Sequence, residues 1–157
     1  MMRICAGGLL VRGGQILLAR RSEDRTFYPG VWDVIGGHCE GDETPAETLV
    51  RELEEEIGVK PSAFEEIAVL DEPRPAEHGE ARYHIFIVTA WGEGHPRLRG
   101  SEHSEVRWLG LDDALALPLA HPEYRALFRS VLGRARARRL TLPLTLPSPR
   151  SGGEGSK

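Results

Sequence analysis

A stretch at residues 37–59 constrains the fold most, because it carries the start and stop signals of a helix. Thr44 is typical of an N-cap, Pro45 suits the first helical position, and Glu47 completes a capping box with Thr44. Gly58 is typical of the left-handed residue that follows a helix. These signals predict a helix that begins at Pro45 and ends just before Gly58.

The predicted helix has two stripes of different chemistry. At about 100° per residue, one face is apolar and is expected to be buried; it consists of Ala46, Leu49, Val50, Leu53 and Ile57. Glu52, Glu55 and Glu56 follow the i, i+3, i+4 spacing beside that face. Carboxylates at this spacing repel one another by roughly 0.2–0.5 kcal/mol per pair. A divalent cation with oxygen ligands would offset the repulsion; the alternative is a solvated acidic face.

The same stretch resembles the Nudix box, the signature of the Nudix hydrolase family. The box runs Gly, five residues, Glu, seven residues, Arg-Glu, an aliphatic, any residue, Glu-Glu, any residue, Gly and an aliphatic. Every position matches, at Gly37, Glu43, Arg51, Glu52, Leu53, Glu55, Glu56, Gly58 and Val59. The resemblance, which is closest to MutT-like members, implies hydrolysis of a phosphoanhydride in a nucleoside diphosphate derivative by attack of water on phosphorus.

The resemblance also implies a metal centre. Glu52, Glu55 and Glu56 are expected to be catalytic and to bind Mg²⁺, for which Mn²⁺ could substitute. Glu52 is also a candidate for orienting or deprotonating the attacking water, since related enzymes differ in which glutamate is the base. In the family, the carbonyl of the residue that matches Gly36 is a further metal ligand. A loop without side chains at Gly36 and Gly37 would let the backbone approach a metal or phosphate.

Three box residues are expected to support the site rather than react. In the family, the residues matching Arg51 and Glu43 form an ion pair that braces the loop against the helix. Gly37 is placed with this group because it opens the box.

A further metal-binding carboxylate is expected ahead of a strand that contains Trp108. By its spacing to this tryptophan, Glu102 matches the extra ligand of MutT-like members, and Glu105 is the rival. The alternative is that both are ordinary loop charges.

Substrate-binding residues are harder to identify from the sequence. Arg20 and Arg21 follow the second predicted strand, where related proteins contact base or phosphate, and arginine suits phosphate well. Trp32 could stack on a base or fill the core. MutT-like hydrolases of oxidised guanine nucleotides read the purine with an asparagine late in the chain, but this sequence has no asparagine. His121 or Glu123 could substitute, and strict specificity for oxidised dGTP is not expected.

The rest of the chain predicts a mixed sheet between helices. Apolar or β-rich runs predict strands at residues 4–11, 15–19, 31–35, 64–70, 82–91 and 106–109. A helical turn is expected from Asp112 or Asp113 to Leu117, and a last helix after His121. Strands on both sides of a helix-bearing segment favour an α/β fold. Resemblance to the Nudix family implies its α/β/α sandwich, a mixed β-sheet flanked by helices.

One Nudix domain is expected over residues 1–133, followed by a tail over 134–157. The tail begins with a basic run of Arg134, Arg136, Arg138 and Arg139. The tetrapeptide Leu-Thr-Leu-Pro then occurs twice, at residues 140–147, and a Ser/Gly/Pro-rich end follows. Proline in every fourth position blocks helix and central strand alike, so residues 138–157 are expected to be disordered.

Composition narrows the class of partner. The net charge of −4 gives no general attraction to nucleic acid, and no stable nucleic-acid complex is expected. No run approaches the roughly 20 apolar residues that span a membrane. Cys5 and Cys39 are the only cysteines, which favours a reducing cytoplasm. The expected partner is a small nucleotide, and a homodimer is expected by analogy with the family.

Three functions remain open at this point. The first is Mg²⁺-dependent cleavage of a ribo- or deoxyribonucleoside triphosphate to the monophosphate and pyrophosphate, a MutT-like housecleaning role. The second is the same chemistry on ADP-ribose, a nucleotide sugar or a dinucleoside polyphosphate. The third is a nucleotide sensor without catalysis, which the intact set of box glutamates disfavours.

Overall fold

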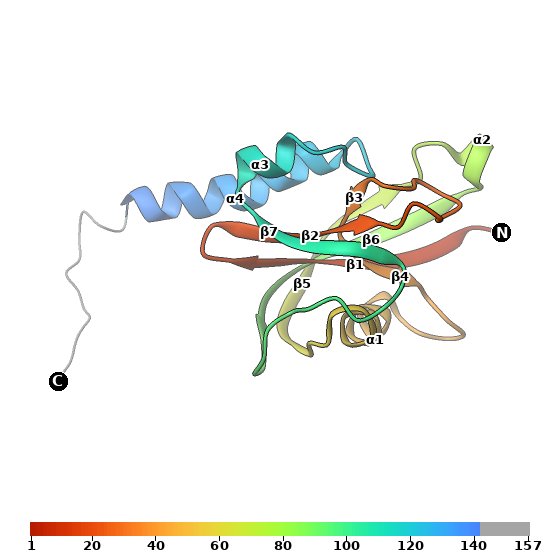
Figure 1. Ribbon diagram of the computed structural model, residues 1–157, viewed down its shortest axis with the longest axis horizontal. Helices are drawn as coiled ribbons and strands as arrows, with labels where there is room; N and C mark the ends of the chain where they lie inside the picture. The colour runs from red at the N-terminus through yellow and green to blue at the C-terminus, as the bar shows by residue number, and fades with distance from the viewer. Residues whose placement is uncertain (142–157) are drawn as a thin grey trace.

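A computed structural model describes residues 1–141 of the chain. In this part the chain forms seven strands and four helices around one mixed sheet (Figure 1). Their order is β1 (Arg3–Arg12), β2 (Gln15–Arg21), β3 (Trp32–Asp33), β4 (Ile35–His38), α1 (Pro45–Ile57), β5 (Pro61–Asp71), α2 (Pro75–His78), β6 (Ala81–Trp91), β7 (His103–Leu109), α3 (Leu111–Leu115) and α4 (Tyr124–Thr141).

The sheet is mixed, as predicted. Its main path is β3-β2-β1-β6-β5, with β4 also paired to β1 and β7 also paired to β2. Only the β1–β6 pair is parallel among the strand pairs of the described residues. Helix α1 covers one side of the sheet, whereas α3 and α4 cover the other (Figure 1). The expected α/β/α sandwich is therefore confirmed.

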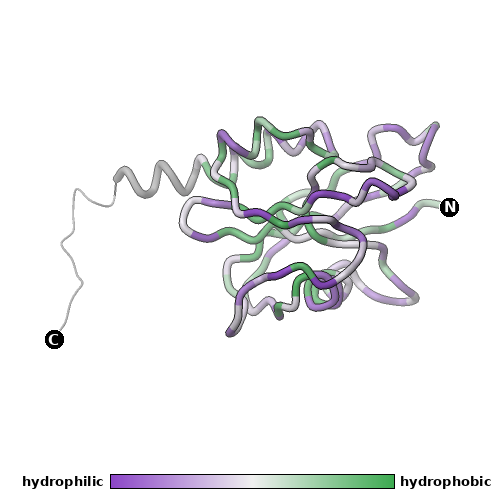
Figure 2. Tube along the Cα trace, in the orientation of Figure 1, coloured by the Kyte–Doolittle hydropathy of each residue, from purple (hydrophilic) through white to green (hydrophobic). Residues whose placement is uncertain are grey.

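The core has two parts, one on each side of the sheet, because side chains alternate along a strand. Leu9 of β1 packs in the cluster that contains Phe128 of α4, while its neighbour Leu10 packs in the cluster that contains Leu53 of α1. All four side chains are fully buried. Hydrophobic residues accordingly concentrate along the central strands and helices in Figure 2, whereas the outer loops are mostly hydrophilic.

The strand expected at 31–35 is two short strands, and the glycines expected in a loop lie in the second of them. Strand β3 pairs with β2, whereas β4 pairs with β1. Gly36 lies opposite Gly7, and a Cβ at Gly36 would overlap the backbone carbonyl of Ala6. The absence of a side chain at Gly36 is therefore required by strand packing.

Two further differences concern the connecting segments. The expected loop at 71–81 contains the short helix α2, which Pro75 begins. Helix α4 continues through Thr141, so residues 138–141 are helical where disorder was expected, since the first proline that blocks a helix comes only at Pro143. Residues 142–157 lie outside the described residues. Within the described part, no helix is long and apolar enough to cross a membrane.

Candidate active site

Helix α1 forms as its local signals predict. The Thr44 side chain accepts a hydrogen bond from the Glu47 amide at 3.2 Å, and the Glu47 carboxylate accepts one from the Thr44 amide at 2.9 Å. Gly58 ends the helix with φ 72° and ψ 26°, in the left-handed region. On the expected apolar face, Leu49, Leu53 and Ile57 are fully buried, whereas Ala46 and Val50 are half-buried.

The acidic stripe divides into two buried carboxylates and one exposed carboxylate. Glu52 and Glu56 are 7% and 5% exposed, whereas the side chain of Glu55 is 54% exposed. Backbone without side chains covers the two buried groups. A Cβ at Gly37 would lie 2.5 Å from Oε2 of Glu52, and a Cβ at Gly100 would overlap the carboxylate of Glu56. A side chain at either glycine would therefore displace the carboxylate that lies against it.

Burial changes the acidity of both groups. Burial raises the pKa of Glu52, and the charge of Glu102 raises it further, while Arg51 opposes the rise. Burial, together with the charges of Glu102, Glu52 and Glu55, raises the pKa of Glu56 to about 7. A cluster that resists ionisation in this way is typical of a functional site.

One atom of this cluster has no partner. Oε1 of Glu52 is buried and accepts no hydrogen bond within the described residues. No three acidic, histidine or cysteine side chains in that part of the chain converge into a complete cation site. The orphaned oxygen and its hard carboxylate neighbours nevertheless fit a divalent cation such as Mg²⁺, which prefers oxygen ligands and supplements one or two carboxylates with water and phosphate.

Arg51 connects the helix to the segment before it. Its Nε and Nη2 donate to the two oxygens of Glu43 at 2.7 and 3.0 Å, and Nη2 also donates to the carbonyl of His38 at 3.1 Å. Its Nη1 donates to Glu52 at 3.0 Å and to Glu55 at 3.3 Å. The hydrogen bonds from Arg51 lower the pKa of Glu43 to about 2. The expected ion pair is present, and it fixes the side of Glu52 that faces away from the orphaned oxygen.

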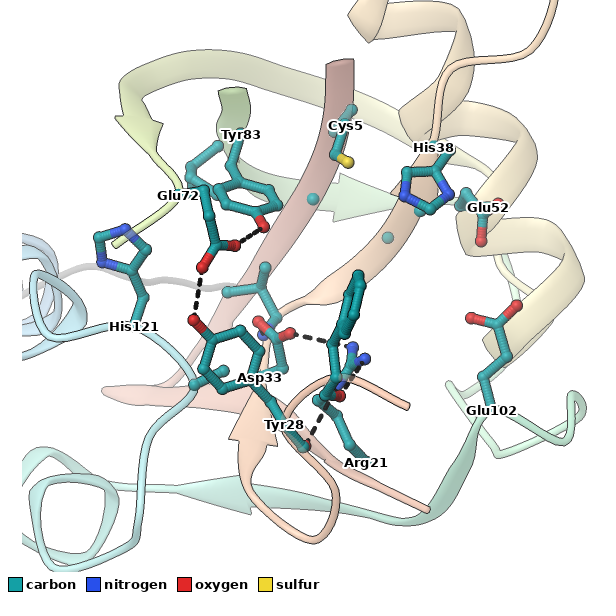
Figure 3. A pocket seen from close by; sticks show the side chains of 18 of the residues that line it. Cys5, Arg21, Tyr28, Asp33, His38, Glu52, Glu72, Tyr83, Glu102 and His121 are labelled. Carbon is teal, nitrogen blue, oxygen red and sulfur yellow. Dashed lines mark hydrogen bonds and ion pairs between the residues drawn. The ribbon is translucent and has the colours of Figure 1, made fainter. Parts of the chain in front are cut away.

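Glu102 lies opposite the helix, just before β7. Its carboxyl group stands across the cavity from Glu52 (Figure 3), and it forms an ion pair with Arg25 at 3.4 Å. The rival Glu105 lies within β7, pairs with Arg107 at 2.5 Å and does not line the cavity. Of the two candidates, only Glu102 is in a position to join the carboxylates of α1.

A cavity runs from these carboxylates along β1 and β4 (Figure 3). One end is formed by box residues and by neighbours of opposite charge: Gly36, Gly37, His38, Glu52, Arg25 and Glu102. The far end is lined by aromatic, acidic and histidine side chains: Tyr28, Glu72, Tyr83, His121, Asp33 and Tyr124. A long ligand could therefore place a charged group at one end and a polar ring at the other.

Glu72 organises the far end. Its carboxylate is 5% exposed and accepts hydrogen bonds from the hydroxyls of Tyr28 and Tyr83, both at 2.5 Å. The amide of Arg74 donates to it at 3.0 Å, and Nδ1 of His78 lies 3.2 Å away. Burial alone would raise the pKa of Glu72, but these hydrogen bonds outweigh burial and lower the pKa to about 2. The carboxylate is thus held ionised inside the cavity wall.

Arg21, a predicted substrate residue, lines the cavity, and its Nε and Nη2 groups donate to loop carbonyls. It donates to the carbonyl of Phe27 at 2.7 Å and to the carbonyl of Tyr28 at 3.1 Å, and it lies 3.6 Å from Asp33. Tyr28 has φ 54°, a value that L side chains rarely adopt. Arg21 and Glu72 therefore act together to hold this strained residue in place.

The other two predicted substrate residues lie outside the cavity. Arg20 pairs with Glu23 at 2.5 Å. Trp32 is 4% exposed and packs in the core beneath α4, with the guanidinium of Arg107 5.0 Å above its ring. The structure supports the core interpretation of Trp32, because the alternation along β3 turns its ring away from the carboxylates.

Comparison with known proteins identifies the family and the fold. The NUDIX domain profile matches residues 1–131. The chain belongs to the Nudix family. It is 33% identical over 114 residues to the CTP pyrophosphohydrolase of Escherichia coli (strain K12), which covers 71% of this chain and 78% of that protein. It is 33% identical over 131 residues to the NAD-capped RNA hydrolase NudC of Pseudomonas aeruginosa (strain LESB58), covering 83% of this chain and 43% of NudC.

A solved structure agrees with this assignment. The crystal structure of the MutT NUDIX hydrolase from Burkholderia pseudomallei superposes with a TM-score of 0.71 at 29% identity, covering 85% of this chain and 97% of that one. The chain is therefore a Nudix hydrolase, of a family whose members cleave pyrophosphate linkages in nucleotide derivatives.

Several residues of this Nudix site carry no signal in the sequence. His103 is 5% exposed, and its Nδ1 lies 3.4 Å from Oε1 of Glu56. Glu72, Asp33 and Tyr83 line the far end of the cavity. They come from different strands and loops without a shared spacing, so only folding brings them together.

Proposed function

We propose that this chain is a Mg²⁺-dependent pyrophosphohydrolase that cleaves a nucleoside triphosphate to the monophosphate and pyrophosphate. The observation that carries the proposal is the buried Glu52, which lines one end of the cavity together with Glu102 and has the buried Glu56 one turn further along α1. A carboxylate oxygen that is buried without a partner is costly, and a bound cation offsets that cost. The similarity to a CTP pyrophosphohydrolase supports a triphosphate as the substrate.

The acidic residues divide the work. Glu52, Glu55, Glu56 and Glu102, together with the carbonyl of Gly36, would hold Mg²⁺. The bound ion would neutralise phosphate charge and make a water more acidic. Oε1 of Glu52 is buried without a hydrogen-bond partner among the described residues. We therefore assign it one of two roles: it accepts the proton of the attacking water, or it binds the metal directly. Cleavage breaks one P–O bond of the anhydride, and water supplies the oxygen of the new one.

The supporting residues keep those carboxylates in position. Arg51 holds Oε2 of Glu52 and both oxygens of Glu43, which prevents the helix from shifting against the preceding segment. Positioning of this kind accounts for much of the rate enhancement in phosphoryl transfer. The far end of the cavity, with Glu72 and Asp33, would receive the nucleoside.

The test is a panel of nucleotides with Mg²⁺, in which the products are identified by mass. The proposal expects a nucleoside monophosphate and pyrophosphate. Glu55→Gln and Glu56→Gln should each lower kcat by at least about 100-fold, because charge at the metal site is lost. Glu54→Gln is the matched control, since Glu54 is on the same helix, is exposed and has only a 3.9 Å ion pair with Lys60. It should retain activity.

The products decide among the alternatives. A monophosphate together with a sugar phosphate would assign the chain to ADP-ribose or nucleotide-sugar hydrolysis instead. Release of two nucleotides from one dinucleoside polyphosphate would identify the chain as a hydrolase of dinucleoside polyphosphates. Binding of nucleotide without turnover of any panel member would contradict catalysis altogether.

A further inference from the structure

Arg25 occupies a position in the cavity that the box does not explain. It lies in the segment between β2 and β3, is half-buried, and lines the same cavity as Glu52 and Glu102. Its Nη1 is 3.4 Å from Oε1 of Glu102, the carboxylate that faces α1. The positive charge of Arg25 also acts on Glu56 and His38. The guanidinium is therefore held within the acidic end of the site.

The backbone keeps these two side chains near each other. The amide of Ser22 donates to the carbonyl of Glu102 at 3.0 Å, and the hydroxyl of Ser22 donates to the carbonyl of Ser101 at 3.1 Å. The amide of Arg25 in turn donates to the carbonyl of Ser22 at 3.1 Å. The segment that carries Arg25 is thus fastened to the segment that carries Glu102, while the side chains of both residues remain partly exposed at 32% and 41%.

We propose that Arg25 is a substrate-binding residue that exchanges partners: it pairs with Glu102 until a divalent cation takes that carboxylate, and it then binds a phosphate of the nucleotide. This inference rests on the proposed function, because it requires Glu102 to be a metal ligand. Arg25 competes with the cation in the absence of substrate and assists the substrate once the cation is bound.

The chemistry of the groups supports this exchange. A partly exposed ion pair contributes little, about 0–1 kcal/mol, so a divalent cation can displace the guanidinium at small cost. Once displaced, Arg25 remains tethered beside the cation by Ser22. A guanidinium offers several donors in a planar fork that matches two phosphate oxygens. A diphosphate that reaches the metal would therefore lie within the range of Arg25.

The experiment measures metal and nucleotide binding separately in the Arg25→Gln variant of the full chain. Mn²⁺ binding without nucleotide is followed by the electron paramagnetic resonance of the free ion. Nucleotide binding is followed by calorimetry with a non-hydrolysable α,β-methylene triphosphate at saturating Mg²⁺. Arg25→Gln should bind Mn²⁺ about 3-fold more tightly and the analogue about 10-fold more weakly.

Two controls isolate the exchange. Arg82→Gln removes an exposed arginine that has a 3.5 Å ion pair with Asp71 outside the cavity, and it should change neither affinity. In a Glu102→Gln background, Arg25→Gln should no longer tighten Mn²⁺ binding, because the two side chains act through one contact. Unchanged or weaker Mn²⁺ binding in Arg25→Gln, or unchanged analogue binding, overturns the exchange while wild-type hydrolysis leaves the proposed function standing. Failure of the wild-type chain to bind Mn²⁺ or hydrolyse any nucleotide overturns both.

Discussion

Among single residues, the site depends on its glycines as well as on its glutamates, because the backbone lies against the carboxylates where a Cβ is absent. Gly37 and Gly100 pass over Glu52 and Glu56 closely enough that a Cβ at either glycine would contact a carboxylate. The chain lies close against both carboxylates at these glycines, and burial raises the pKa values of Glu52 and Glu56. A site that keeps such groups in place accepts a stability cost in exchange for function.

Gly37→Ala should displace the Glu52 carboxylate, because the new Cβ would lie 2.5 Å from Oε2. Displacement of about 1 Å in a catalytic group costs up to about 100-fold in rate, so we expect kcat to fall roughly 10- to 100-fold. Steady-state kinetics with circular dichroism measures this. Gly92→Ala is the control, since a Cβ there meets nothing within 4 Å. Equal kinetics for both variants would contradict the tight packing at Gly37.

Glu56→Gln should stabilise the metal-free protein at alkaline pH while removing activity. The folded pKa of Glu56 is raised to about 7 from its ordinary 4.5, so its contribution to stability is present below pH 4.5 and is lost as the pH rises through 7. Glutamine avoids this loss. In the presence of EDTA at pH 8, the free energy of unfolding of the variant should exceed that of the wild type by on the order of 1–3 kcal/mol. At pH 4 the two free energies should be equal.

Urea denaturation at the two pH values provides the measurement, with Glu54→Gln as the exposed control on the same helix. A Glu56→Gln variant that is less stable than the wild type at pH 8 would show that Glu56 is not a buried charge in the metal-free protein.

At the scale of elements, α1 is the part that fixes where the carboxylates point. Its start and its end are local features and are present as the sequence predicts, and three of the five residues of its apolar face are fully buried. The contacts of Arg51 then set the helix against the strand before it. The direction of the carboxylates is therefore decided jointly by helix caps and by one arginine.

Thr44→Ala should destabilise α1 by removing its capping box. Loss of an N-cap side chain costs about 1 kcal/mol, which lowers the urea midpoint. Thr44→Ser keeps the accepting oxygen and should retain most of the stability. Activity per folded molecule should change little in either variant, since Thr44 does not line the cavity. A Thr44→Ala midpoint equal to that of the wild type would contradict the importance of this cap.

At the scale of the whole molecule, Glu72 connects parts of the chain that are distant in sequence. It follows β5 and accepts hydrogen bonds from Tyr28 in the loop after β2 and from Tyr83 in β6. A single buried carboxylate thus joins a strained loop to the sheet and forms one wall of the cavity.

Acid should unfold the protein partly through Glu72. Its folded pKa is lowered to about 2, so the stability that it contributes is present above its ordinary pKa of 4.5 and is lost as the pH falls toward 2. Between pH 6 and pH 2.5, the free energy of unfolding of Glu72→Gln should fall by on the order of 2 kcal/mol less than that of the wild type. Part of the acid sensitivity should remain, because the pKa of Glu43 is also lowered to about 2. Urea titrations across this pH range measure the free energy of unfolding. If it fell equally steeply with pH in the wild type and in Glu72→Gln, Glu72 would not be a source of the acid sensitivity.

The amino-acid order alone is sufficient to predict the helix that carries the box, the order and approximate position of most strands, and the family to which the chain belongs. These features depend on neighbours three or four residues away in a helix, or two residues away in a strand, so local spacing is sufficient to predict them. The spacing to Trp108 favours Glu102 over Glu105 as the further carboxylate but does not decide between them.

Which groups share the cavity depends on the folded chain and is not predictable from local spacing. The folded chain places Glu102 opposite Glu52, packs Trp32 in the core, bonds two nitrogens of Arg21 to loop carbonyls, and brings Glu72 together with Tyr28 and Tyr83. Glu102 and Glu52, and likewise Glu72 and Tyr28, are separated by tens of positions, and the strand pairing that joins these parts of the chain leaves no periodic pattern. The physical reason is that burial and hydrogen bonding are set by whatever the folded chain brings near, which no local window contains.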